Sequence, residues 1–135
     1  MLRNIVLATS IGLAGTATAA AMPGSIPTFE RVMPAGHTLK VASLSAIDQA
    51  CHSLGPFTIG LIDAPHDGRV EVVQGTGFPN FFTWNTRSSC NTRKLPATIV
   101  SYTPAPGYVG EDDFAVEIVG PQGHVGRARY RITVR

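Results

Sequence analysis

Charge is scarce in this chain. Asp, Glu, Lys and Arg make up 15% of its 135 residues, and 11 basic residues nearly balance 9 acidic ones, for a formal net charge of +2. A protein so close to neutral is not built to bind nucleic acid or to lie on a membrane through a basic patch. Hydrophobic residues make up 44%, which is unlike a disordered chain. We therefore expect a single compact domain.

Motifs for metal binding and covalent catalysis are missing as well. The four histidines are scattered, and none has the H-x-H or H-x-x-x-H spacing of a zinc site. The sequence has no G-x-S-x-G or S-x-x-K nucleophile motif and no C-x-x-C redox pair. We therefore predict a protein that is not an enzyme and that needs no cofactor.

Residues 1–21 have the organisation of an export signal. Arg3 supplies the positive start, an apolar stretch runs from Ile5 to Ala17, and an A-x-A cleavage site ends at Ala19, with an equivalent site ending at Ala21. A membrane helix that stays in place is the alternative, but the stretch of about 13 residues is shorter than the roughly 20 that a span requires. The pattern predicts a cleaved signal peptide and a periplasmic or secreted protein that is not embedded in a membrane.

The chain has two cysteines, Cys51 and Cys90, and both follow the predicted signal peptide. An even pair in an oxidising compartment predicts a disulfide. In the chain-entropy description, closing a loop of this length contributes about 4 kcal/mol to stability. The alternative is a reactive Cys51 thiol with His52 as its base. Neighbouring residues on a strand point to opposite faces, which disfavours that pairing.

Turn-forming residues divide the rest of the chain into about seven short segments with strand-like patterns and no sustained helical period. The clearest alternation includes Phe114 and Val116 on one face, and arginines alternating with apolar residues over 127–135. This predicts an all-β fold, an antiparallel β-sandwich of about seven strands, over residues 38–135. Residues 22–37, rich in Pro and Gly, are predicted to be a flexible lead-in segment that can pair as an edge strand.

Residues 102–114 read YTPAPGYVGEDDF. This run resembles the Y-x-P-x-x-G-[FY]-x-G-x-D-x-F signature of bacterial cadherin-like and immunoglobulin-like repeats. Residues 100–135 continue the family pattern with an alternating strand, a Gly-bearing turn and a final strand ending in I-x-V. The resemblance implies a single immunoglobulin-like or cadherin-like module. It also implies an exported, non-enzymatic role in binding or in envelope structure, with an envelope protein or a glycan as partner.

The signature also has a physical interpretation of its own. Tyr102 and Phe114 are expected to pack across the corner, and Asp112 is expected to cap the turn. In the hairpin that follows, acidic residues are expected to face arginines of the last strand: Glu117 with Arg127 or Arg129, and Asp113 with Arg131. This favours a balanced, solvated face over a site for an acidic partner.

Three adjacent acidic residues, Glu111, Asp112 and Asp113, could supply oxygen ligands to calcium. A site there would make the protein a calcium-dependent adhesion module. The run lacks the spaced D-x-D ligands of cadherin-type sites, and a capped turn with ion pairs accounts for the same residues. We therefore predict no metal site and keep calcium as the weaker alternative.

The loop 78–87 holds the densest group of aromatic residues in the chain. Exposed aromatic rings can stack on sugars, so the loop is a candidate site for carbohydrate or cell-wall binding. Core packing is the alternative, because a short strand over 81–85 would send two of these rings to one face together. The candidate binding residues are aromatic or cationic: Phe81, Phe82, Trp84, Arg87 and Arg93.

Overall fold

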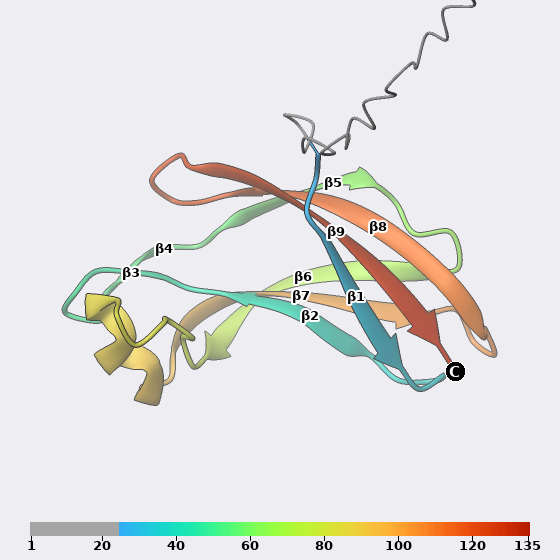
Figure 1. Cartoon of the computed structure of the whole chain (residues 1–135), viewed down its shortest axis with the longest axis horizontal. Coiled ribbons are helices and arrows are strands. Elements are labelled where there is room, and N and C mark those ends of the chain that lie inside the picture. The colour runs from blue at the N-terminus through green and yellow to red at the C-terminus, as the bar shows by residue number, and fades with distance from the viewer. Residues whose placement is uncertain (1–24) are drawn as a thin grey trace, which may run out of the picture.

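The computed structural model describes residues 25–135. The predicted signal peptide and its two cleavage positions, Ala19 and Ala21, lie outside the described residues. Within the described part, no helix is long and apolar enough to cross a membrane. The elements are nine strands and one short 3₁₀ helix (Figure 1): β1 (Thr28–Met33), β2 (Leu39–Leu44), β3 (Ala46–Ile47), β4 (Ser53–Gly55), β5 (Thr58–Asp63), β6 (Gly68–Gly77), η1 (Thr86–Thr92), β7 (Leu95–Pro104), β8 (Gly110–Val119) and β9 (Val125–Val134).

Two larger sheets contain seven of the nine strands, and the prediction of an all-β fold is confirmed. The first sheet has the order β1-β9-β8-β5 and the second has the order β2-β7-β6, while β3 and β4 form a small separate sheet. All pairings are antiparallel except one: β1 runs parallel to β9, from Thr28 opposite Arg129 to Met33 opposite Val134. The prediction of a purely antiparallel fold is therefore wrong at this edge. β1 lies within the segment 22–37, which pairs here as an edge strand.

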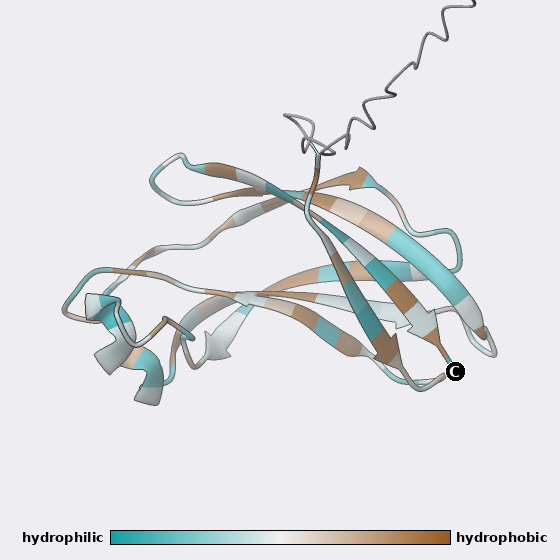
Figure 2. Cartoon of the chain, in the orientation of Figure 1, coloured by the Kyte–Doolittle hydropathy of each residue, from teal (hydrophilic) through white to brown (hydrophobic). Residues whose placement is uncertain are grey.

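The main hydrophobic core lies between the two larger sheets. Hydrophobic and hydrophilic residues alternate along β9 (Figure 2), and its four apolar residues at every second position from Ala128 to Val134 are buried. Val100 and Tyr102 of the second sheet belong to the same buried cluster. The Tyr102 ring also stacks on the Phe114 ring, with the ring centroids 5.9 Å apart, which confirms the predicted packing across the corner.

Asp112 is buried at this corner and fixes the turn between β5 and β6. Its carboxylate accepts hydrogen bonds from the backbone N–H groups of His66 (2.9 Å) and Asp67 (3.0 Å) and from the Tyr102 hydroxyl (2.7 Å). Burial raises the pKa of the Asp112 carboxyl, but these hydrogen bonds outweigh it and hold the pKa below its ordinary value. Asp112 therefore caps a turn, although this is the turn that joins β5 to β6 and not the loop that precedes Asp112.

The outward arginines of β9 are in ion pairs with acidic residues: Arg127 with Glu117, Arg129 with both Asp113 and Asp63, and Arg131 with Glu30. The predicted pair of Glu117 with Arg127 is confirmed. Asp113 lies opposite Arg131 in the β8–β9 register, as predicted, but its carboxylate contacts Arg129. Arg131 is instead in an ion pair with Glu30 of β1, the strand on the other side of β9. The face is balanced in charge.

Candidate functional site

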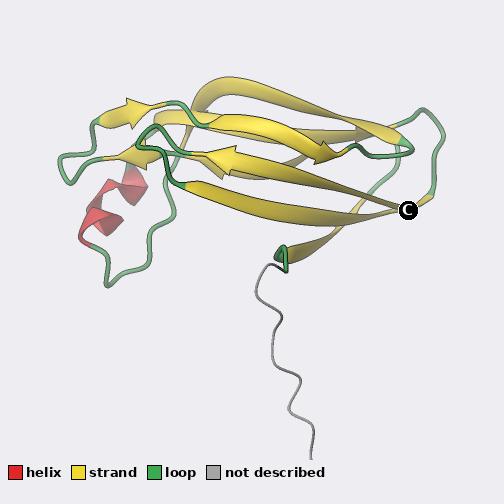
Figure 3. Cartoon of the chain, turned by 90° about the horizontal axis from the view of Figure 1, so that it is seen from above, coloured by secondary structure: helices red, strands yellow, loops and turns green. Residues whose placement is uncertain are grey.

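The chain between β6 and β7 forms a long loop with η1 at one end of the sheets (Figure 3). The predicted strand over 81–85 is wrong, because the backbone there bonds to side chains and not to a neighbouring strand. The Phe81 N–H donates to the Asn91 side-chain oxygen, and the Asn91 amide donates back to the Phe81 carbonyl, both at 2.9 Å. Asn85 begins η1 by accepting a hydrogen bond from the Arg87 N–H at 2.8 Å.

A second, smaller core lies beneath this loop. Its buried members are Ile47, Cys51 and Cys90, with Phe81 and Leu95 packed against them. Cys51 and Cys90 form the predicted disulfide, which is thereby confirmed. The bond ties η1 to the turn between β3 and β4, so the loop is fastened to the scaffold independently of the main core.

The turn that carries Cys51 is shaped by Asp48. One carboxylate oxygen of Asp48 accepts hydrogen bonds from the backbone N–H groups of His52 (2.8 Å) and Ala50 (2.9 Å). The hydrogen bond from the His52 N–H lowers the pKa of the Asp48 carboxyl. This effect is larger than that of desolvation, which raises the pKa. Cys51 has a φ of 65°, a left-handed conformation that is uncommon outside glycine. The Asp48 carboxylate is thus engaged by its own turn.

Phe82 and Trp84 lie on the outside of the loop, and we call this pair the aromatic platform. Their side chains are 73% and 79% exposed, and the two rings stack with an interplanar angle of 8° and centroids 5.7 Å apart. The alternative, in which both rings pack into the core from a strand over 81–85, is wrong, because that segment is not a strand and both rings are exposed. Phe81 is the ring that packs inward, and Phe78 is also exposed.

The two predicted arginines have different surroundings. The Arg87 side chain is half-buried, and its Nε donates to the Ile47 carbonyl at 2.9 Å, so it holds the loop in place. Arg93 follows η1 and is exposed, as is Lys94. Neither is in an ion pair within the described part of the chain.

The sequence carries a charge signal here that motif searching misses. No Asp or Glu occurs between Glu71 and Glu111, and the formal charges in that interval are Arg87, Arg93 and Lys94. The segment that presents the aromatic platform is therefore wholly basic, although the whole chain is nearly neutral. Counting charges by segment would have found it.

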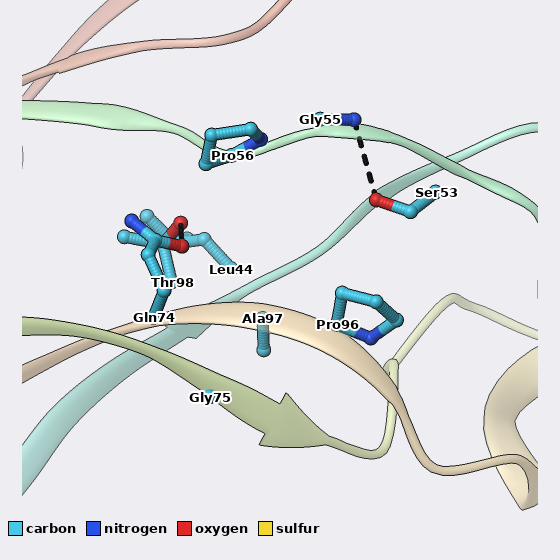
Figure 4. Close-up of a pocket in the computed structure, with 9 residues that line it drawn as sticks. All are labelled: Leu44, Ser53, Gly55, Pro56, Gln74, Gly75, Pro96, Ala97 and Thr98. Carbon is cyan, nitrogen blue, oxygen red and sulfur yellow. Dashed lines mark hydrogen bonds between the residues drawn. The ribbon is translucent and has the colours of Figure 1, made fainter.

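A cavity of about 240 Å³ lies between the β2-β7-β6 sheet and the segment 53–56, which contains β4 (Figure 4). The buried Thr98 hydroxyl donates to the Gln74 side-chain oxygen at 2.8 Å and accepts from the Phe57 N–H at 3.0 Å. These bonds link β7 to its neighbour β6 and to Phe57, the residue before β5, and they satisfy the Thr98 hydroxyl. The lining residues are mostly small or apolar: Leu44, Ser53, Gly55, Pro56, Gln74, Gly75, Pro96, Ala97 and Thr98.

The structure does not bring together Glu111, Asp112 and Asp113, the residues of the weaker calcium alternative, as a set of ligands. Asp112 is buried and saturated with hydrogen bonds, while Asp113 is half-buried in an ion pair with Arg129 and Glu111 is exposed. Among residues 25–135, no three His, Cys, Asp or Glu side chains are grouped so as to hold a metal ion.

Comparison with known proteins assigns no family to this arrangement. No protein-family model matches the chain, and neither the curated proteins nor the solved structures contain a match.

Proposed function

We propose that the protein is an exported, non-enzymatic binding module that takes up glycans through the aromatic platform. The observation that carries the proposal is the exposure of two parallel rings, Phe82 and Trp84, on a loop that is itself fixed. Large apolar side chains left in water stabilise the fold little, and clustered ones mark binding surfaces. A flat pair of rings suits the C–H face of a sugar.

The loop is held rigidly, and this supports a binding site in preference to an irregular surface without a function. The disulfide, the reciprocal bonds of Asn91 with Phe81, and the bond from Arg87 to Ile47 hold the backbone under the rings. A surface fixed before binding loses little conformational entropy when it binds a ligand.

The basic setting favours an acidic glycan over a neutral one. Arg93 and Lys94 follow η1, which has seven residues and so spans at most about 14 Å if it is straight. A ligand of several sugar units can therefore contact the platform with one unit and place a carboxylate or phosphate near these cations with another.

The fold we propose is the immunoglobulin-like or cadherin-like sandwich. In the immunoglobulin fold, strands C, F and G form one sheet and strands B, E and D belong to the other. The strands β2, β5, β6, β7, β8 and β9 can be lettered B to G in sequence, leaving out β3 and β4 of the small sheet. The orders β5-β8-β9 and β2-β7-β6 then correspond to C-F-G and B-E-D. The signature 102–114 runs from the end of β7 into β8. Export to the periplasm or beyond rests on the predicted signal peptide and agrees with the disulfide.

Trp84 is the only tryptophan in the chain, so its fluorescence reports directly on the platform. We expect soluble peptidoglycan fragments, which carry carboxylates, to change this fluorescence with tighter binding than neutral chito-oligosaccharides. Phe82→Ala should weaken binding about tenfold or more, the loss of a stacked ring. Phe29→Ala, at an exposed ring on β1, is the matched control and should bind normally. Equal binding by Phe82→Ala and the unaltered protein would refute the glycan site, as would no binding of either probe.

A further inference from the structure

The two larger sheets have four edge strands, and three of them carry features that discourage pairing with another chain. On β1 the exposed residues include charged Glu30 and Arg31. On β2 the register shifts between Lys40 and Ala42, and on β5 it shifts between Leu61 and Asp63. Bulges and charges of this kind are common protection for edges.

The fourth edge, β6, has no register shift, and its two charged residues, Arg69 and Glu71, have opposite signs. Ten residues, Gly68–Gly77, pair with β7 without a register shift, which makes β6 a long and regular edge. Val72 alternates with Val70 on the core-facing side, yet it is 41% exposed, and Val73 on the outer side is 53% exposed. The main-chain groups and the valines along this edge suit the addition of one more strand.

We propose that β6 pairs antiparallel with β6 of a second copy of this chain, about a two-fold axis at Val70. This interface goes beyond the proposed glycan binding and does not depend on it. A two-fold axis at a residue keeps the core-facing sides of both copies on the same side of the joined sheet. The choice of residue is then decided by charge.

Arg69 and Glu71 lie on the outer side of β6, 3.0 Å apart at Nε and Oε1. With the axis at Val70, Arg69 of one copy lies opposite Glu71 of the other, twice by symmetry. An axis at Arg69 or at Glu71 would place like charges opposite each other, and an axis at Val72 would leave both charges unmatched. In the favoured register, Val70 of one copy lies opposite Val70 of the other. Val72 lies opposite Gly68 of the other copy, so the added strand covers Val72, the exposed valine on the core-facing side.

Sedimentation velocity over a range of protein concentrations tests the proposal. We expect a reversible dimer that Arg69→Glu weakens about tenfold or more, because two opposite-charge pairs become like-charge pairs. The double variant Arg69→Glu/Glu71→Arg exchanges the charges and should restore the dimer. Both residues are exposed and their ion pair contributes little to folding, so all variants should melt like the unaltered protein.

Arg127→Glu is the matched control, since it reverses an exposed arginine of a cross-strand ion pair on a different sheet. It should leave the dimer unchanged. A protein that stays monomeric at every concentration would overturn the proposal. So would a dimer that Arg69→Glu leaves intact, or one that the double variant fails to restore.

Discussion

The Tyr102 hydroxyl donates a 2.7 Å hydrogen bond to the Asp112 carboxylate, and this bond joins β7 of one sheet to β8 of the other. Both residues are buried, so loss of the donor leaves a carboxylate short of one partner. We expect Tyr102→Phe to lower the free energy of unfolding by about 1.5–3 kcal/mol, as for a hydrogen bond to a charged group. Urea unfolding measures the change. Tyr130→Phe is the control, because the Tyr130 hydroxyl has no hydrogen-bond partner among the described residues, and an equal loss there would contradict the role of the bond.

Stability should fall in acid through Asp112. Its pKa in the folded protein lies below the ordinary 3.8, so its contribution is fully present above that value and is lost as the pH falls through the folded pKa. Asp112→Asn cannot titrate. The difference in unfolding free energy between the unaltered protein and Asp112→Asn should therefore shrink between about pH 6 and about pH 2.5. A difference that does not change over this range would mean that the Asp112 carboxyl is not preferentially ionised in the folded state.

Gly68 leaves room for the Tyr102 ring. A Cβ at Gly68 would come within 2.5 Å of Tyr102 Cε2, whereas a Cβ at Gly60, in edge strand β5, would meet nothing within 4 Å. We expect Gly68→Ala to destabilise the protein by about 1–3 kcal/mol, the usual cost of overpacking. Gly60→Ala should be neutral or slightly stabilising. Thermal melts of the two variants side by side decide the matter, and similar melts would argue against the close contact.

The disulfide should matter most for the loop. Replacing both Cys51 and Cys90 by Ser removes a cross-link worth up to about 4 kcal/mol, while the main core between the sheets keeps all its residues. The variant should melt lower but keep its β-sheet circular dichroism. Trp84 fluorescence should move toward that of the free side chain, because the loop under it is released. Loss of all sheet signal at room temperature would show that the two cores are not independent.

Trp84→Ala should leave stability unchanged within about 0.5 kcal/mol, because the side chain is 79% exposed. Phe114→Ala, at a fully buried ring, should by comparison cost about 3–5 kcal/mol. Chemical denaturation of both variants separates a surface role for Trp84 from a core role. A large loss of unfolding free energy in Trp84→Ala would indicate that the Trp84 ring packs in the core.

Local patterns in the sequence predicted the parts of the fold that depend on near neighbours. The alternation along β9 and the stacking of Tyr102 on Phe114 follow from such patterns, whereas the Cys51–Cys90 disulfide follows from the presence of two cysteines alone. The parallel partner of β1 was not, because strand pairing between distant segments leaves no local pattern. In the candidate site, the sequence left surface and core open as alternatives for Phe82 and Trp84. Their exposure depends on Asn85 and Asn91, whose side chains take the hydrogen bonds that a neighbouring strand would supply.

The parallel pairing of β1 with β9 joins the first described strand to the last. During synthesis, β1 has no partner in its sheet until β9 has been made. Such distant contacts must close a large loop before they stabilise anything, and they slow folding. The first sheet therefore gains its β1 edge only after its other three strands are available. A circularly permuted chain that places β1 after β9, through a linker long enough to return along the sheet for the parallel pairing, should fold faster for this reason.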